Sequence, residues 1–424
     1  MLLKSLDPRL LSIGGAGLGQ IFMFAAMALV SRVYPANALN QYGIFFSLFN
    51  IIQISASLRL EQGLVYESEP DRVRALFSAC CLVIAPVTFI CSLISLFYLA
   101  RNPDTAHSSA ALSILLFCVV CFSGPSRVYS QYIARSDAFA VLAVLNFLRP
   151  TFIAICQVAG ILFGAGLLAL PIALLVSQIA LFFASRFLIH RCVAGGLPTF
   201  SLTGTWEAAE SHKAFVLFSL PQNLVFVVSE SVVPLSLSFL FPGAGSVALF
   251  WLASRAVFAP ATVVAESIRP MIYRSIGNSG GNLRRTVIKT LGGLAAISAV
   301  PVIIIALFGD VLFGLVFGPR WASASDYALV LAVLVGFNMC SIPIVGSLPV
   351  IRLQHGLLIA EICGLLVRIS LIFMFHWASA ISVIMATTAI YIAVIGGFYI
   401  FAMVRIMRHH PRSGPTEMLA WDSE

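Results

Sequence analysis

The chain has 424 residues, of which 60% are hydrophobic and only 10% are charged, and its mean hydropathy is +1.00. A soluble domain carries about a quarter charged residues, so this composition excludes one and predicts an all-α polytopic membrane protein. The net charge of +8 could indicate nucleic-acid binding, but in a membrane protein the basic residues can instead be concentrated in the loops on one side of the membrane.

Apolar stretches of about 20 residues, the length of a membrane-spanning helix, follow one another along the whole chain. The first stretch follows Lys4 and Arg9 and has no small-residue cleavage site, so we expect it to be retained. In chain order, the predicted spans are residues 10–30, 42–64, 75–100, 110–134, 138–163, 165–188, 213–241, 247–272, 287–309, 325–350, 356–376 and 379–404. The sequence therefore predicts about twelve transmembrane helices.

The basic residues are distributed unevenly between the two sets of loops that such a bundle has. One set carries sixteen of them: Lys4, Arg9, Arg72, Arg74, Arg135, Arg186, Arg191, Lys213, Arg274, Arg284, Arg285, Lys289, Arg352, Arg405, Arg408 and Arg412. The other set carries Arg32, Arg101 and Arg320. Because cytoplasmic loops carry the excess of Lys and Arg, both termini are predicted to be cytoplasmic, and the surplus reflects topology rather than nucleic-acid binding.

A loop rich in Gly, Ser and Thr, residues 190–212, divides the chain near its middle. It predicts an N-terminal six-helix lobe (1–189), a cytoplasmic linker (190–212), a C-terminal six-helix lobe (213–404) and a cytoplasmic tail (405–424). An internal similarity supports this division, because Ser31-Arg32-Val33-Tyr34-Pro35 matches Ser238-Phe239-Leu240-Phe241-Pro242. Parallel repeats of this kind predict a central cavity between the two lobes.

Several features argue against an enzyme or a metalloprotein. No external loop reaches domain size, and the chain contains no Gly-Lys dipeptide from which an ATP-binding P-loop could be built. Cys118 and Cys121 form a CxxC inside an apolar span without companion His or Cys pairs. Glycines 14, 15, 17 and 19 follow no strand and indicate helix packing rather than a phosphate loop. We expect no metal, no cofactor and no covalent chemistry.

Ionisable residues inside the spans are the main functional signal. Each costs roughly 2.5–3.5 kcal/mol near the bilayer centre, so it should face an aqueous cavity or a partner. The arginines are Arg59, Arg127, Arg149, Arg255, Arg269 and Arg368, and the glutamates are Glu61, Glu230, Glu266 and Glu361. The surplus of two positive charges predicts an anionic substrate, and the planar guanidinium fork suits the oxygens of a diphosphate.

Helical spacing, about 100° per residue, indicates which of these residues share a surface. Arg255, Thr262, Glu266 and Arg269 form one polar stripe along span 247–272, although Glu266 and Arg269 also fit an ion pair near the cytoplasmic interface. Arg149 precedes Pro150, which frees a backbone carbonyl. We expect Arg255 and Arg149 to contact the substrate.

Three further pairs are less specific. Ser123 and Arg127 are four residues apart, and Glu361 and Arg368 are seven apart, so the members of each pair share a helix face. These residues fit either cavity lining or pairing between helices. Arg59 and Glu61 are two apart on a helix and are therefore predicted not to pair with each other.

One carboxylate stands apart from the basic residues. Glu230 aligns with Asn223 and Ser219 on span 213–241, which has no basic residue within its apolar part. An isolated buried carboxylate tends to take up a proton or a cation, so we expect Glu230 and Asn223, with Glu266 and Glu361, to couple transport to a proton or sodium ion. The alternative is a neutral Glu230 hydrogen-bonded to a neighbouring helix.

The sequence resembles the polysaccharide (O-antigen type) flippases of the multidrug, oligosaccharidyl-lipid and polysaccharide exporter superfamily. The resemblance is carried by Ser31-Arg32 with Tyr34-Pro35, by Ser57-Leu58-Arg59-Leu60-Glu61, by Ala253-Ser254-Arg255 with Pro260, and by Phe317-Gly318-Pro319-Arg320-Trp321 with Tyr327. It implies a two-lobed bundle that moves an undecaprenyl-diphosphate-linked oligosaccharide across the bacterial inner membrane by ion-coupled alternating access. Gly63 departs from the pattern, which has alanine there.

We therefore predict a lipid-linked oligosaccharide flippase for polysaccharide biosynthesis, such as that of lipopolysaccharide or exopolysaccharide, with the lipid bilayer and polysaccharide assembly proteins as further partners. One alternative is a multidrug exporter of the same superfamily, which would favour an acidic and aromatic lining. Lipid II flippases, which usually have two more spans, are another. A membrane glycosyltransferase or polymerase would instead need acidic catalytic residues on large loops.

Overall fold

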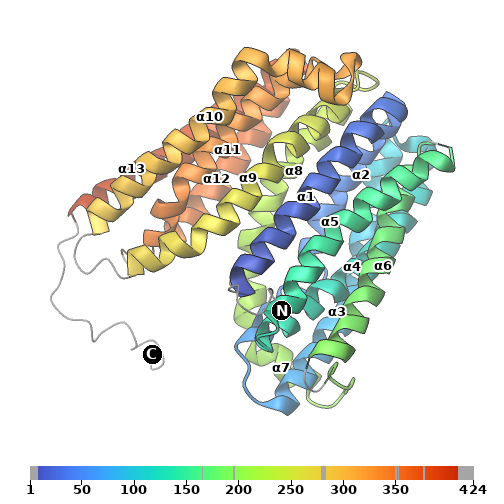
Figure 1. Cartoon of the computed structure of the whole chain (residues 1–424), viewed down its shortest axis with the longest axis vertical. Helices are drawn as coiled ribbons and strands as arrows, with labels where there is room; N and C mark the ends of the chain where they lie inside the picture. Colours follow the sequence, from blue (N-terminus) through green and yellow to red (C-terminus); the bar gives the residue numbers. More distant parts are fainter. Residues whose placement is uncertain are drawn as a thin grey trace.

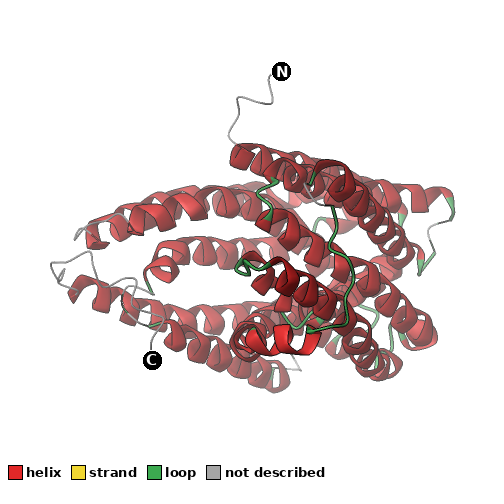
Figure 2. Ribbon diagram, turned by 90° about the horizontal axis from the view of Figure 1, so that it is seen from below, coloured by secondary structure: helices red, strands yellow, loops and turns green. Residues whose placement is uncertain are grey.

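The computed structural model describes residues 8–164, 166–193, 196–277, 283–348, 351, 353–375 and 378–408. All regular elements in these ranges are helical (Figures 1 and 2). The long helices are α1 (Pro8–Val33), α2 (Ala36–Ser55), α3 (Pro70–Arg101), α4 (Ser109–Arg135), α5 (Phe139–Leu162), α6 (Ala169–Cys192), α8 (Leu220–Leu240), α9 (Ser246–Gly277), α10 (Leu283–Phe317), α11 (Ala324–Ser347), α12 (Gln354–Met374) and α13 (Ala380–Arg408). Short helical segments are η2 (Leu60–Val65), η3 (Ala106–Ser108), α7 (Thr205–Ser211), η4 (Phe215–Ser219) and η5 (Pro319–Trp321).

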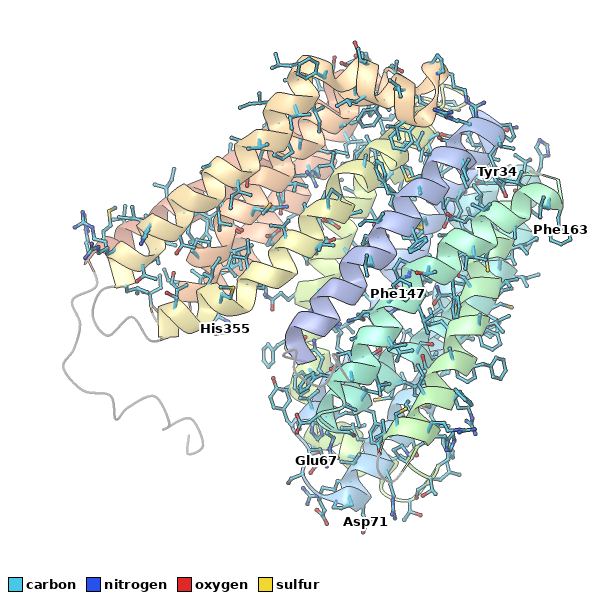
Figure 3. All side chains as sticks on the ribbon, in the orientation of Figure 1. Tyr34, Glu67, Asp71, Phe147, Phe163 and His355 are labelled. Atoms are coloured by element: carbon cyan, nitrogen blue, oxygen red, sulfur yellow. The ribbon has the colours of Figure 1, made fainter. Side chains whose placement is uncertain are left out.

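The long helices form two lobes, as predicted. Helices α1–α6 pack with one another, helices α8–α13 do the same, and α1 and α2 pack across the boundary against α8, α9 and α10. Figure 1 shows the lobes meeting at the end where α1 leads into α2 and diverging toward the opposite end. We call the first the closed end. Tyr34 marks it in Figure 3, whereas Glu67, Asp71 and His355 lie at the opposite end. The linker boundaries at residues 190–212 remain a prediction.

Ten helices in the described part of the chain are long and apolar enough to cross a membrane. Helix α1 contributes a shorter apolar segment, Gly17–Val33, and the remaining long helix, α2, has 20 residues but is not among the ten. Polar side chains explain this difference, because Asn37, Asn40, Gln41, Asn50 and Gln53 dilute its apolar character. The multi-pass architecture predicted from composition is therefore confirmed.

The predicted span at 42–64 is wrong in its bounds. Helix α2 begins directly after Pro35, whose fixed φ suits a helix start, and ends at Ser55. Leu58 and Arg59 then have positive φ values of 51° and 64°, a conformation that L-residues in a helix do not adopt. The chain therefore turns before the short helix η2, which places Arg59 in this turn and Glu61 in η2, and neither in a membrane helix.

Small residues let the helices approach closely. A Cβ atom at Gly15 would lie 2.7 Å from the Ala143 carbonyl oxygen, and one at Gly19 would lie 2.8 Å from that of Phe147, both on α5. A Cβ atom at Gly43 of α2 would meet the Val247 side chain of α9 at 2.8 Å. Where the structure describes them, these glycines thus serve the packing role expected from the sequence.

Candidate functional site

A cavity of about 600 Å³ lies between the two lobes. Helices α2 and α4 line it from the N-terminal lobe, and α8, α9, α11, α12 and α13 line it from the C-terminal lobe. Five of the predicted site residues line this cavity: Arg127, Arg255, Arg269, Arg368 and Glu230. Charges from separate segments of the sequence are therefore brought to one chamber.

Arg255 lies in the middle of the cavity wall on α9. Its guanidinium carbon lies 4.0 Å from the centroid of the Phe46 ring on α2, in the other lobe. Stacking on an aromatic face holds the planar group in place without using its N–H donors. Within the described residues, Arg255 forms no ion pair, so its hydrogen-bonding edge is available to a ligand.

Arg368 belongs to a polar cluster inside the C-terminal lobe. Its Nη1 donates to the Ser229 carbonyl oxygen (2.6 Å) and to Ser229 Oγ (3.2 Å), and its guanidinium stacks on the Tyr391 ring at 4.5 Å. The Tyr391 hydroxyl in turn donates to Glu361 Oε2 (2.9 Å). Arg368 is buried and is held by contacts within its own lobe, although its Nε has no hydrogen-bond partner among the described residues. These contacts indicate that Arg368 organises this cluster.

Glu230 extends this cluster into the cavity. It interacts electrostatically with Arg368 and Glu361, and its side chain is exposed to the chamber. Glu361 does not line the cavity and lies behind it, bonded to Tyr391. Two carboxylates beside one guanidinium leave one formal negative charge in this cluster when both are ionised. The predicted carboxylates of α8 and α12 thus share one site, with Glu230 as its accessible member.

Arg59 and Glu61 form an ion pair, contrary to the prediction. Arg59 Nη1 lies 3.5 Å from Glu61 Oε1, and Ser57 Oγ donates to Glu61 Oε2 at 2.6 Å. The prediction assumed a helix, in which residues two apart point in opposite directions; the positive φ values at Leu58 and Arg59 abolish that geometry. Both side chains are buried outside the cavity lining. Arg59 Nε has no hydrogen-bond partner there.

Arg127 and Arg149 place further positive charge in the N-terminal lobe. Arg127 lines the cavity, donates to the Gln53 carbonyl oxygen (3.3 Å) and interacts electrostatically with Arg59 and Glu61. Arg149 is half-buried, does not line the cavity and lies within electrostatic range of Arg127. Arg59 and Arg127 therefore share one carboxylate, Glu61, and Arg149 adds a third positive charge within range of Arg127. An anion near Arg127 would offset their mutual repulsion.

The remaining predicted residues have different surroundings. Arg269 is exposed at the cavity edge. Asn223 Nδ2 donates to the Ser219 carbonyl oxygen of its own helix (2.7 Å) and does not line the cavity. The side chain of Glu266 lies outside the described residues, so its predicted pairing with Arg269 or with an ion stays a prediction.

Sequence reasoning missed the polar face of α2. Ser47, Asn50 and Gln53 line the cavity at spacings of three residues, which places them on one side of the helix. That spacing is visible in the sequence, but these residues are uncharged and give a weaker signal in an apolar helix than a charged residue does. It also missed Tyr391, whose link between Arg368 and Glu361 depends on the packing of α13 against α12.

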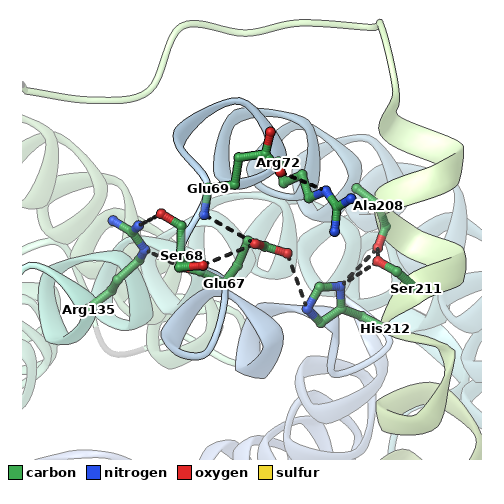
Figure 4. A network of polar contacts seen from close by, with 8 residues as sticks. All are labelled: Glu67, Ser68, Glu69, Arg72, Arg135, Ala208, Ser211 and His212. Atoms are coloured by element: carbon green, nitrogen blue, oxygen red, sulfur yellow. Dashed lines mark hydrogen bonds and ion pairs between the residues drawn. The ribbon is translucent and has the colours of Figure 1, made fainter.

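A second polar network lies at the opposite end of the bundle (Figure 4). Glu67 Oε1 accepts the backbone N–H groups of Ser68 and Glu69, while Arg135 Nε donates to the Glu67 carbonyl oxygen at 2.9 Å. His212, just before η4, has its Nε2 4.0 Å from Glu67 Oε2. Its ring occupies the space that a Cβ atom at position 63 would need, which explains why Gly63 departs from alanine.

Comparison with known proteins identifies the fold. No protein-family model and no curated protein sequence matches the chain. Among solved structures, the lipid II flippase MurJ in an inward closed conformation superimposes with a TM-score of 0.72 at 16% identity, over 94% of this chain and 90% of that chain. A ligand-bound structure of the MATE multidrug transporter DinF-BH gives 0.68 at 16% identity, covering 95% of each chain.

An outward-facing MATE family multidrug resistance transporter of the MOP superfamily is also similar. It gives a TM-score of 0.59 at 14% identity, over 95% of this chain and 97% of that chain. The two-lobed arrangement and the cavity between the lobes therefore belong to a known transporter architecture. The chain has the fold shared by these flippases and multidrug transporters.

Proposed function

We propose that this protein is a flippase that carries an undecaprenyl-diphosphate-linked oligosaccharide between the leaflets of the bacterial inner membrane by alternating access. The proposal rests on one observation above all. Arg127 and Arg255, from different lobes, line the same cavity, and neither forms an ion pair within the described residues. A pair of guanidinium groups without a direct ion pair to a carboxylate is suited to a diphosphate.

Glu230 supplies a candidate coupling site. Its carboxylate faces the cavity beside Glu361 and Arg368, so binding of a proton or a sodium ion there would change the charge that the substrate meets. The distribution of basic residues supports an orientation with both termini in the cytoplasm. In that orientation the closed end faces away from the cytoplasm, and the cavity would receive substrate from the cytoplasmic side.

Multidrug export is the second candidate. It is favoured by the aromatic side chains of the cavity, which include Phe46, Phe226, Phe250, Trp251 and Phe258. Aromatic rings together with one exposed carboxylate would suit an organic cation. Four arginines in the same lining oppose this reading, because they repel a cation.

Reconstitution separates these functions. Purified protein in liposomes would be given either a fluorescent undecaprenyl-diphosphate oligosaccharide or the cationic dye rhodamine, with protein-free liposomes as the control. The proposal predicts transfer of the lipid-linked sugar to the other leaflet with its mass unchanged, and no uptake of the dye. Transport of the dye alone would support the exporter, and a change in the mass of the sugar would indicate an enzyme.

A further inference from the structure

The closed end contains a reciprocal set of contacts between α1 and α10, which belong to different lobes. Proline at position 35 has no N–H for the Ser31 carbonyl, and proline at position 319 has none for the Leu315 carbonyl, so each helix ends with a free acceptor. Each acceptor is then used by an arginine from the other lobe. Arg320 Nη2 donates to the Ser31 carbonyl oxygen, and Arg32 Nη2 donates to the Leu315 carbonyl oxygen.

Further bonds complete this set. Arg320 Nη2 also donates to the Tyr34 carbonyl oxygen (2.6 Å), and Trp321 Nε1 donates to the Ser31 carbonyl oxygen (2.8 Å). Ser31 Oγ donates to the Phe317 carbonyl oxygen (3.1 Å). We call Ser31, Arg32, Tyr34, Arg320 and Trp321 the arginine latch. The two guanidinium groups of this latch lie at helix C-termini. The partial negative charge of the helix dipole there strengthens their hydrogen bonds to the carbonyl oxygens.

A second set of contacts joins α3 to α8 at the same end. Asn102 Nδ2 donates to Ser238 Oγ (2.6 Å), and the Tyr98 hydroxyl donates to the Leu235 carbonyl oxygen (2.7 Å) and also contacts Ser238 Oγ (2.9 Å). We call Tyr98, Asn102 and Ser238 the Asn102 latch. Beside it, Asp104 accepts a hydrogen bond from Asn40 of α2 (2.6 Å).

The internal repeat relates the two latches. Ser31 near the end of α1 corresponds to Ser238 near the end of α8, and each of these serines contacts the junction after the third helix of the other lobe. The two sets of contacts are thus related by the internal repeat, and both hold the two lobes together at the closed end. A single side-chain hydrogen bond, from Ser219 Oγ of η4 to Gln62 Oε1 of η2 (2.7 Å), is a separate contact between the two halves of the chain.

We propose that the arginine latch and the Asn102 latch together form the gate of the closed end, and that both must break before the cavity can open there. The inference rests on alternating access as proposed above, but it does not depend on the identity of the substrate. It assigns to Arg320 a role in holding the gate shut, since its Nη2 donates to two carbonyl groups of the other lobe. Arg32 has the reciprocal role, since it donates to the carbonyl groups of Leu315 and Val316.

The test measures access to the cavity without any substrate. A Ser254→Cys reporter, which lines the cavity, is placed in a background lacking the nine native cysteines and is labelled with a membrane-impermeant maleimide from the closed-end side. Arg320→Ala should accelerate labelling by about tenfold or more, because loss of a charge-assisted hydrogen bond shifts a two-state equilibrium by that factor. Labelling at the parent rate would overturn the proposal.

Arg101→Ala is the matched control. Arg101 ends α3 at the same end of the bundle, and its guanidinium stacks on Phe97 of its own helix at 4.0 Å. Its removal takes away the same charge from the same side without removing a hydrogen bond of either latch, so labelling should stay at the parent rate. Acceleration equal to that of Arg320→Ala would show a charge effect and contradict the gate.

A second arm locks the gate. Asn102→Cys with Ser238→Cys, cross-linked by a short bifunctional reagent, should suppress closed-end labelling of the reporter even in the Arg320→Ala background. Cleavage of the cross-link should restore labelling at position 254, which is read by mass spectrometry of its own peptide because the thiols freed at positions 102 and 238 also react. Undiminished labelling of the cross-linked protein would refute the gate whichever substrate is carried. If Arg320→Ala fails to fold, Trp321→Phe, which loses only the bond to Ser31, provides a milder opening of the same latch.

Discussion

Replacement of Arg255 by alanine tests the substrate site directly. A guanidinium that grips a diphosphate through two charge-assisted hydrogen bonds contributes about 1.5–3 kcal/mol for each bond. The Phe46 ring, 4.0 Å away, holds the guanidinium in place with and without substrate, so this stacking does not enter the difference in affinity. The expected loss is therefore about 3–6 kcal/mol, or roughly 10²–10⁴-fold in affinity for the lipid-linked substrate.

The assay is the rate at which reconstituted protein moves a fluorescent undecaprenyl-diphosphate oligosaccharide between leaflets. Arg255→Lys retains the charge but loses the planar fork, so its rate should lie between those of wild type and Arg255→Ala. Arg101→Ala, which removes a charge far from the cavity lining, is the control and should transport normally. Wild-type transport by a correctly inserted Arg255→Ala variant would refute the assignment of this residue.

Three other substitutions have defined outcomes. Glu230→Gln should make transport independent of the proton or sodium gradient, measured by collapsing each gradient in turn; retained dependence would exclude Glu230 as the coupling group. Tyr391→Phe removes the 2.9 Å bond to Glu361 but keeps the ring, so thermal unfolding should show a loss of about 1 kcal/mol, and an unchanged Tm would show the bond to be unimportant. Gly63→Ala should destabilise by about 1–3 kcal/mol through overlap with the His212 ring, and His212→Ala should remove that effect; equal losses in both backgrounds would contradict the overlap.

Composition and hydropathy were sufficient to predict the membrane fold. Twelve long helices are present in the described ranges, and they form the two lobes that were predicted. The internal repeat around Ser31 and Ser238 stays a prediction. Arg255 and Glu230 were predicted to face a cavity, because an ionisable residue in an apolar helix is costly unless it faces water or a partner. Both line the cavity between the lobes.

Local backbone conformation could not be predicted in the same way. The left-handed residues Leu58 and Arg59 give no clear sequence signal, since neither is glycine, asparagine or aspartate, and they turn a predicted non-pair into the Arg59–Glu61 ion pair. Contacts between segments that are distant in the sequence could not be predicted either. The motifs around Ser31 and Arg320 were recognised separately, but only the structure shows that they bind each other.

Ligand preference of the purified protein tests the central claim most directly. Wild-type protein in nanodiscs would be titrated with undecaprenyl diphosphate, undecaprenyl monophosphate and the rhodamine dye, with Arg255→Ala in parallel. A cavity in which Arg127 and Arg255 face the substrate from the two lobes predicts tightest binding of the diphosphate, weaker binding of the monophosphate, and loss of the difference in Arg255→Ala. Equal binding of the two lipids, or preferential binding of the cationic dye, would contradict the account.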